Sequence, residues 1–337
     1  MSKRGLWAGS SAWKVLLLVW APSTADSLRE RWASRRWISR VYNGRRPLLF
    51  ATLALLLLIS VFRSGQWYGE RALLYDDRAM NRPGRACDNR WAALDRIVIV
   101  AGHAIYLGSG DGGAQDVTAE SSWALEPYQR GHVSTFLAHI ETGVRVAAAD
   151  NRTLLVFSGG DSRAQAGPMN EAESYWRIAQ ARDWFGHADD VRWRVVTEEF
   201  ARDSLENLLF SMCRFRQVTQ RYPMHITVVS MNMKRRRFSE MHRAALRIPP
   251  HRFTFLGIDP PGGYERSEGE AGELVNAVLP FSEDPYGCRH SLLTDKRRAR
   301  NPYAWSVPYP KGCPEMRALF RRCHRRVYRG RLPWETE

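Results

Sequence analysis

The sequence of 337 residues contains few cysteines and few acidic side chains, and both shortages limit what the protein can be. Its five cysteines follow no zinc-ligand spacing, so we expect no metal site built on them. The GxxxxGK[ST] loop that cradles nucleotide phosphates is also absent. Only 35 Asp and Glu residues oppose 50 Lys and Arg residues, which gives a formal net charge of +15.

The excess of positive charge is concentrated in two parts of the chain. Residues 1–46 carry ten Lys or Arg against two acidic residues, and most of the remaining excess follows Asp295. A folded domain with one evenly basic face would indicate nucleic acid or an anionic membrane surface as the partner. Because the middle of the chain is nearly balanced in charge, we expect no nucleic-acid partner.

One long apolar run, PLLFATLALLLLISVF at residues 47–62, contains no charged side chain. A membrane-spanning helix takes about 17–25 residues, so this run is at the short limit. Arginines border it on both sides, and Trp67 and Tyr68 follow, as is typical of a membrane interface. We expect a single-pass transmembrane helix at 47–62, a basic cytosolic arm at 1–46 and a linker at 63–94. The alternative is a buried core helix.

The positive-inside rule places the arm in the cytosol and the rest of the chain in the lumen of the ER or Golgi. There, Asn151-Arg152-Thr153 would be a usable glycosylation sequon. An Arg-rich, acid-poor arm also fits a mitochondrial presequence before an inner-membrane anchor, which remains the alternative. In an oxidising lumen one disulfide would form among Cys288, Cys313 and Cys323, whereas a reducing compartment would keep them as thiols.

Between residues 95 and 259, short apolar runs alternate with amphipathic stretches. The runs predict strands at 97–102, 153–159, 193–199, 225–231 and 252–258. The amphipathic stretches predict helices at 128–149, 170–185, 204–222 and 234–247. Such alternation predicts a mainly parallel sheet in a Rossmann-like three-layer α/β/α domain. The proline-rich, basic residues 260–337 predict an irregular extension that wraps the domain and ends in a helix at 315–328.

Loops that follow parallel strands lie at one edge of the sheet, where doubly wound folds bind ligands. After Ser158, the pair Gly159-Gly160 could bring backbone N–H groups close to an anion beside a helix start, and Arg163 could close over it. A sharp turn out of the strand explains the glycines equally well. His103, after the first strand, is a candidate base by its position only, and a loop histidine with satisfied hydrogen bonds is the alternative.

Two carboxylates follow neighbouring strands at the same edge. Glu171 and Glu198 could act as acid and base or hold a divalent cation. Asp203 and Glu206 have the spacing of a helix capping box, which is usually structural. Asn207, one residue on, could face the crevice with both donor and acceptor atoms.

A run of four cations, residues 234–237, opens the fourth predicted helix. Cations oppose the macrodipole at a helix amino terminus, and an anionic ligand would relieve the conflict. We therefore expect Lys234 and Arg237 to neutralise an anion. A solvated basic face is the alternative.

In their order, these motifs resemble the YdcF/SanA-like family, the domain of unknown function 218. The matching residues are Ser158-Gly159-Gly160, Glu171-Ala172, Glu198, Asp203 to Asn207 and Arg237. Ser204 stands where the family has Thr, and Lys234 stands where it has His. The match covers about 97–258 and looks most like the membrane-anchored fungal members. The resemblance implies a Rossmann-like fold, and S-adenosylmethionine binding is suggested for one branch, but it implies no general reaction.

We therefore expect a membrane-anchored domain that binds or processes an anionic, phosphorylated or nucleotide-like small molecule. The sequence does not identify a cofactor, and whether the protein is an enzyme stays open. The alternatives are a non-catalytic membrane scaffold and, less well supported, an S-adenosylmethionine-binding methyltransferase-like protein. The candidate catalytic residues are Glu171 and Glu198. The candidate ligand-binding residues are Gly102, His103, Ser158, Gly159, Gly160, Arg163, Asp203, Ser204, Asn207, Lys234 and Arg237.

Overall fold

A computed structural model describes residues 89–108, 116–259 and 266–335. Residues 85–337 form one compact unit. The predicted arm, the predicted span at 47–62 and most of the predicted linker lie outside the described residues. Within the described part, no helix has both the length and the apolar character needed to cross a bilayer.

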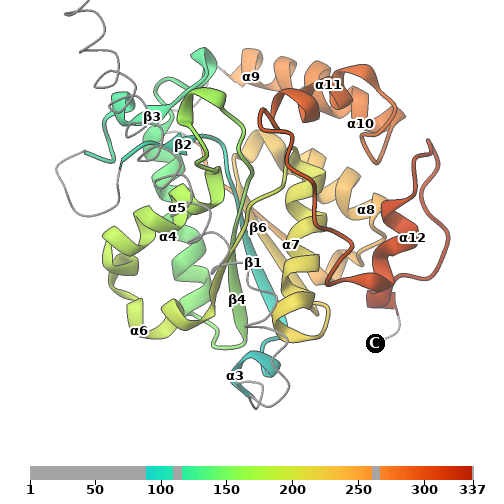
Figure 1. The fold of residues 1–337 in the computed structure, drawn as a ribbon, viewed down its shortest axis with the longest axis horizontal. Coiled ribbons are helices and arrows are strands. Elements are labelled where there is room, and N and C mark those ends of the chain that lie inside the picture. Colours follow the sequence, from blue (N-terminus) through green and yellow to red (C-terminus); the bar gives the residue numbers. More distant parts are fainter. Residues whose placement is uncertain (1–88, 109–115, 260–265, 336–337) are drawn as a thin grey trace, which may run out of the picture. The chain divides into compact units, whose positions relative to one another are not determined.

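A five-stranded parallel sheet forms the centre of this unit, as the alternating sequence pattern predicts (Figure 1). Its strand order is β5-β4-β1-β6-β7, and every neighbouring pair is parallel. The strands are β1 (Arg96–Ala101), β4 (Thr153–Ser158), β5 (Val195–Glu198), β6 (His225–Ser230) and β7 (Phe253–Gly257). The chain moves outward from β1 to β4 and β5, then returns to the other side of β1 with β6. This reversal creates a topological switch point between β1 and β6.

Helices cover both faces of the sheet, so buried strands can be apolar on both sides. The helices α4 (Val133–Ala148), α5 (Glu171–Ala181) and α6 (Ala188–Val191) lie on one side in Figure 1, and α7 (Ser204–Thr219) and α8 (Arg243–Ala245) on the other. Val98 and Val100 belong to the core beneath α4 and α5, whereas Ile97 and Ile99 belong to the core beneath α7. A short helix, α3 (Asn89–Ala92), precedes the sheet.

The connection from β1 to α4 carries a small antiparallel ribbon, β2 (Ile105–Tyr106) with β3 (Trp123–Ala124). The predicted helix at 128–149 therefore begins only at Val133. The predicted helix at 234–247 is also not one α-helix. A 3₁₀ turn at Asn232–Lys234 leads into a π-helix at Arg237–His242 and then the short α8. Such π-helical segments often occur at functional sites.

The expectation of an irregular C-terminal extension is wrong in part. It forms α9 (Arg266–Glu273), a π-helical segment (Leu274–Val278), α10 (Leu279–Glu283), α11 (Ser291–Ala299) and α12 (Arg317–Phe320). The predicted helix at 315–328 ends at Phe320, because the arginines that follow would repel one another on successive turns. In Figure 1 the orange and red extension lies beside α7 and α8. Its apolar side chains, such as Tyr309 and Trp334, complete the core beneath α7.

Two disulfides join the extension to the rest of the unit and to itself. Cys213 of α7 is bonded to Cys313, and both are fully buried. Cys288 is bonded to Cys323. The sequence indicated one bond among the three tail cysteines under oxidising conditions, and it missed Cys213 because that residue lies in a helix 100 positions away.

Candidate functional site

The switch point between β1 and β6 is the place where a fold of this topology binds its ligands. His103 follows β1, Ser230 is the last residue of β6, and Lys234 ends the turn after β6. The Ser230 Oγ lies 3.3 Å from His103 Nε2, and the Lys234 Nζ lies 2.7 Å from His103 Nδ1. The structure thus joins the predicted His103 and Lys234 directly, through the two nitrogens of one ring.

His103 is enclosed in this cluster and is neutral. Burial, and then the positive charge of Lys234, lower the pKa of His103 well below its usual value. Its ring stacks on Phe136 and lies 5.1 Å from the ring of His139. A protonated Lys234 can only donate a hydrogen bond, so Nδ1 of His103 must accept it and Nε2 must carry the proton. In that state His103 donates to Ser230 rather than acting as a base toward it.

The Lys234 amine has no carboxylate partner within ion-pair distance in the described residues. Burial, and then the nearby positive charge of Arg237, lower the pKa of Lys234 to about 7, although Glu273 acts in the opposite direction. Arg300 also lowers it. The guanidinium of Arg300 donates to the carbonyl of Arg202 at 3.0 Å. Several positive charges therefore converge on the switch point.

Arg237 lies in the same region, but its charge is compensated. Its Nη2 donates to Glu273 Oε2 at 2.9 Å, and its Nε lies 2.9 Å from Glu273 Oε1. Glu273 is the last residue of α9, so the C-terminal extension supplies the counter-ion. The adjacent Arg236 points outward and lies 3.6 Å from Glu240. Of the predicted cation pair, Arg237 thus has a carboxylate partner, and Lys234 has none among the residues that the structure describes.

The glycine loop after β4 does not offer the anion-binding N–H groups that the sequence suggested. The N–H of Gly159 donates to the Glu198 carbonyl at 2.9 Å, and that of Gly160 donates to the Ala201 carbonyl at 2.8 Å. The glycines are needed instead because other parts of the chain pack too closely against them to leave room for a Cβ. A Cβ on Gly160 would lie 2.9 Å from the Ala201 oxygen, and one on Gly159 would lie 2.5 Å from Glu171 Oε2. The turn interpretation therefore fits this loop better than the anion cradle.

Glu171 begins α5 and lies over two glycines at the carboxyl edge. A Cβ on Gly102 would lie 2.6 Å from Oε2 of Glu171, so this carboxylate packs against the residues that follow both β1 and β4. Its Oε1 accepts a hydrogen bond from Ser162 Oγ. Asn170 caps the helix by accepting from the Glu173 N–H at 2.6 Å. Glu171 therefore links the two loops at the edge beside the switch point.

Glu198 ends β5 and is almost completely buried. Ser158 Oγ donates to its Oε2 at 2.7 Å, and the Phe200 N–H donates to its Oε1 at 2.9 Å. Asn207 of α7 donates to Ser158 Oγ at 2.9 Å and completes the chain. Burial raises the pKa of Glu198 to about 8, although these hydrogen bonds favour the ionised form. Glu198 and Glu171 share no hydrogen-bond partner among the described residues, because Glu171 accepts from Ser162 instead.

Asp203 caps α7, as its spacing predicts, by accepting from the Glu206 N–H at 2.9 Å. Arg297 of α11 donates to its other oxygen at 2.6 Å. Burial would raise the pKa of Asp203, but the charge of Arg297 outweighs it and holds that pKa at about 2. Glu206 does not complete the box at Asp203, because it accepts from the N–H of Arg202 instead. This cluster fastens the extension to α7.

Two further candidates are occupied by partners within the chain. Ser204 Oγ lies 2.7 Å from Nε2 of the buried His242. Arg163 donates to the Ser162 carbonyl at 2.8 Å, and its Nε lies 3.3 Å from Glu126. Both residues are at the carboxyl edge, and neither contacts His103 or Lys234 in the described structure.

Several residues at the switch point were not predicted from the sequence. Ser230 ended an apolar strand and gave no signal of its own. Glu273 and Arg300 lie in the extension, whose packing against the switch point no local pattern reveals. The segment 108–113, GSGDGG, has GxGxxG spacing, but the next α-helix begins only at Val133, and most of the segment lies outside the described residues. Within the described ranges, no group of three or more His, Cys, Asp or Glu side chains could hold a metal ion.

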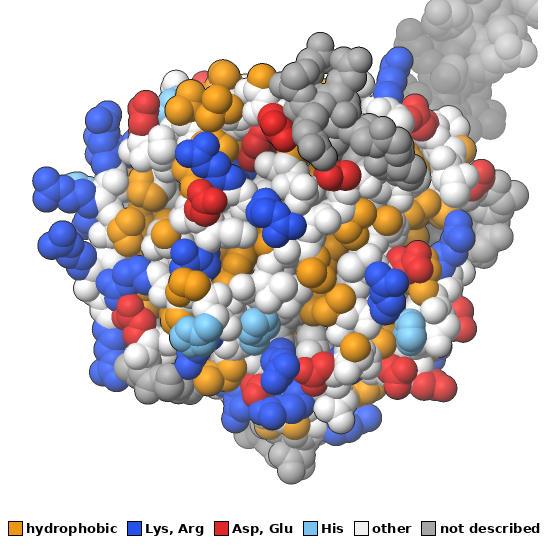
Figure 2. All heavy atoms as spheres, turned by 180° about the vertical axis from the view of Figure 1, so that it is seen from behind, with side chains coloured by type: hydrophobic (Ala, Val, Ile, Leu, Met, Phe, Trp, Pro, Cys, Tyr) orange, Lys and Arg blue, Asp and Glu red, His pale blue; other side chains and the backbone are white. Residues whose placement is uncertain are grey.

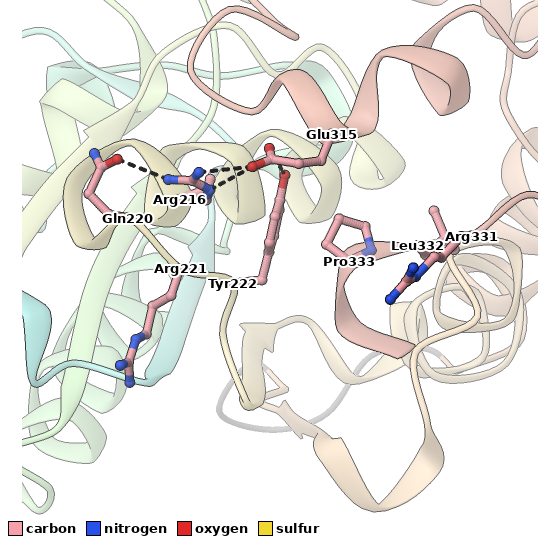
Figure 3. A pocket seen from close by; sticks show the side chains of 8 residues that line it. All are labelled: Arg216, Gln220, Arg221, Tyr222, Glu315, Arg331, Leu332 and Pro333. Carbon is pink, nitrogen blue, oxygen red and sulfur yellow. Dashed lines mark hydrogen bonds and ion pairs between the residues drawn. The ribbon is translucent and has the colours of Figure 1, made fainter. Parts of the chain in front are cut away.

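A pocket of about 470 Å³ lies elsewhere, at the carboxyl end of α7 (Figure 3). Arg216 donates to Glu315 there at 2.8 Å, and Tyr222 donates to the same carboxylate at 3.0 Å. The helix of 16 residues separates this pocket from the carboxyl edge by about 24 Å at 1.5 Å per residue. Because its central charges satisfy one another, we favour the switch point as the ligand site.

Comparison with known proteins finds a similar yeast protein whose description assigns it no activity. The chain is 28% identical over 262 residues to the Saccharomyces cerevisiae protein YOR238W, described as uncharacterized, in a match that covers 63% of this chain and 86% of that protein. No family model matches the sequence. No solved structure matches it either. The described site is therefore interpreted from its own chemistry.

Proposed function

We propose that the domain binds an anionic small molecule, phosphorylated or nucleotide-like, at the switch point between β1 and β6. The observation that carries the proposal is Lys234, a largely enclosed amine that is bonded to the neutral His103 and has no carboxylate within ion-pair distance in the described part. A buried charge without a counter-ion costs free energy. An anion at this position would supply the missing counter-ion and hold Lys234 protonated.

The residues around Lys234 suit recognition better than nucleophilic catalysis. Arg300 adds positive charge, while Ser230 and His103 add polar atoms that can orient an oxygen-rich group. His103 donates to Ser230 while Lys234 is charged, so Ser230 is not activated in that state. Loss of the Lys234 proton would let Nδ1 of His103 donate and leave Nε2 as an acceptor toward Ser230. An enzyme would therefore gain a basic His103 only after Lys234 deprotonates.

Thermal unfolding of purified residues 85–337 tests the proposal. The ligands are inorganic phosphate, nucleoside phosphates, sugar phosphates and S-adenosylmethionine. A ligand at 100 times its Kd adds about 2.7 kcal/mol of stability, which is about 5–10 °C in Tm for a domain of this size. We expect such a rise for a phosphorylated ligand with the wild type and with Arg236→Gln, a charge removal two residues away that faces outward. Lys234→Met should abolish it.

Two outcomes would refute the proposal. One is the absence of a shift with every ligand in the set. The other is an equal shift for wild type and Lys234→Met, since the amine would then play no part. A shift with S-adenosylmethionine alone would favour the methyltransferase-like alternative.

We further propose that the protein is a single-pass membrane protein whose folded part faces an oxidising lumen, and that it belongs with the YdcF/SanA-like proteins. Two disulfides support the oxidising compartment, because such bonds are rare in reducing ones. Asn151 is exposed in the turn before β4, where a glycan could be attached. Loss of an endoglycosidase-sensitive form in Asn151→Gln would confirm lumenal exposure. An unglycosylated but fully oxidised wild type would favour the mitochondrial alternative.

The scaffold alternative rests on the basic C-terminal extension. Deletion of residues 295–337 cannot distinguish it from a binding domain, because the deletion removes Arg297, Cys313 and much of the core beneath α7. Point variants separate the two instead. A scaffold should tolerate Lys234→Met, whereas a switch-point binding protein should not.

A further inference from the structure

The arginines near the end of the chain are densely spaced and have no acidic partners among the described residues. Several buried or half-buried arginines elsewhere are paired with a carboxylate, as Arg237 is with Glu273 and Arg297 with Asp203. We call residues 321–331 the arginine loop. It contributes six arginines, and none of them lies within 4 Å of a described carboxylate: Arg321, Arg322, Arg325, Arg326, Arg329 and Arg331.

The arginine loop is fixed to the domain although it has little regular structure. The disulfide from Cys288 holds it at Cys323. Arg247 donates to the carbonyl of Tyr328 at 2.8 Å and to that of Gly330 at 2.9 Å. The Tyr328 N–H donates to the hydroxyl of Tyr286 at 2.8 Å. The positive charges are therefore held close together in one arrangement, in spite of their mutual repulsion.

The exposed side of the loop combines this charge with apolar surface. Val327 is 36% exposed between Arg326 and Tyr328. A depression of about 380 Å³ is lined by the loop itself, with Arg322, His324, Arg326 and Arg329 among its walls. In the view from behind, Lys and Arg side chains gather along the edge that carries the C-terminal extension (Figure 2). An apolar residue among guanidinium groups suits an interface between water and hydrocarbon.

We propose that the arginine loop docks the folded domain onto an anionic phospholipid bilayer, with guanidinium groups on lipid phosphates and Val327 entering the interface. Guanidinium groups bind phosphate in bidentate geometry, and each basic residue near an anionic membrane surface adds about fivefold to binding. The choice of a bilayer over a soluble polyanion rests on the exposed Val327 and, in part, on the proposed membrane span at 47–62. With that span in the bilayer, the predicted linker at 63–94 would tether the domain to the same membrane.

Co-sedimentation of residues 85–337 with vesicles tests the proposal, because this unit contains both hydrophobic cores and lacks the predicted span. The vesicles contain phosphatidylcholine alone or with phosphatidylserine, at low and high salt. The variant replaces four exposed loop arginines by Gln: Arg321, Arg325, Arg326 and Arg329. The matched control replaces four exposed arginines on or near α4, α5 and α6: Arg130, Arg145, Arg182 and Arg192.

We expect the wild type and the control to bind phosphatidylserine vesicles at low salt and to release them at high salt. The loop variant should lose several hundredfold in partitioning, about fivefold for each arginine. Val327→Ser should weaken vesicle binding severalfold but leave binding to heparin or a DNA oligonucleotide unchanged. Folding of each variant is checked by its Tm.

Three results would overturn the proposal. The first is no binding of the wild type to anionic vesicles. The second is an equal loss in the loop variant and the control, which would show that net charge alone drives the binding. The third is tight binding to a soluble polyanion together with vesicle binding that does not depend on Val327, which would identify a polyanion site instead. Because Lys234 is unchanged in these variants, the outcome is independent of the switch-point ligand test.

Discussion

Replacing Glu198 by glutamine removes a carboxyl group that is enclosed at the end of β5 but keeps its shape. In the folded protein the pKa of this group is raised to about 8, whereas in the unfolded chain it is close to 4.5. Between these values the folded state binds the proton and the unfolded state does not. The group therefore contributes stability that is fully present below about pH 4.5 and is lost as the pH rises through 8.

The size of the effect follows from the two pKa values. The loss approaches 1.36 kcal/mol per pH unit inside the window and stops above about pH 9. Between pH 6 and pH 8 the wild type should lose about 2 kcal/mol from this group alone. Glu198→Gln does not titrate, so its free energy of unfolding should rise relative to that of the wild type by this amount over the same interval.

Urea unfolding without reductant at pH 6, 7, 8 and 9 measures the difference. Other titrating groups are common to both proteins and cancel. Glu199→Gln, which removes a carboxyl group one residue away that is not fully buried, is the matched control and should show no comparable divergence. A difference between Glu198→Gln and the wild type that stays constant from pH 6 to pH 9 would refute the assignment. In that case Glu198 would be ionised throughout, held by the hydrogen bonds from Ser158 and Phe200.

Three further changes test other parts of the structure. Lys234→Met should be more stable than the wild type at pH 6. Because burial lowers the pKa of Lys234 to about 7, the difference in unfolding free energy should shrink by on the order of 1 kcal/mol per pH unit from pH 7 to 9. Urea titrations measure this difference, and a difference that does not change with pH would contradict the prediction. Cys213→Ala opens a loop of about 100 residues and should cost about 2–5 kcal/mol of unfolding free energy, with an unchanged Tm as the contrary result. Gly160→Ala places a Cβ against a backbone oxygen and should cost about 1–3 kcal/mol by urea unfolding, whereas Gly272→Ala, which meets open space, should cost nothing; equal effects would exclude a steric cause.

The sheet could be predicted because strands that are buried on both faces consist of consecutive apolar residues. Residues 153–158 and 225–230 are such runs, and both strands begin within one residue of the predicted start. The placement of His103 and Lys234 at one edge followed from the same pattern, since residues after parallel strands must meet there. Their direct contact could not be predicted, because it depends on how the turn at 232–234 folds.

Most helices of the extension, and the contacts that it makes, could not be predicted for a different reason. Its helices are short and polar, so their apolar faces are too small to give a periodic signal; α11, SLLTDKRRA, buries only Leu293 among its residues. Its partners lie far away in sequence, as Arg297 and Asp203 do. The glycine loop shows a third limit. The pair Gly159-Gly160 indicates that some group packs closely against the backbone. It does not indicate whether that group is a ligand or, as in the structure, the chain's own Glu171 and Ala201.

The bond between Cys213 and Cys313 has a consequence during biosynthesis. At about 5–20 residues per second, the ribosome completes Cys213 about 5–20 s before its partner. Cys288 is made 25 residues earlier than Cys313 and is the first of the tail cysteines to become available. During most of this interval Tyr309, which packs against Phe210 of α7, is not yet made, and Leu319 follows only after Cys313. If Cys213 pairs first with Cys288, thiol exchange has to break that bond before the native pairs can form.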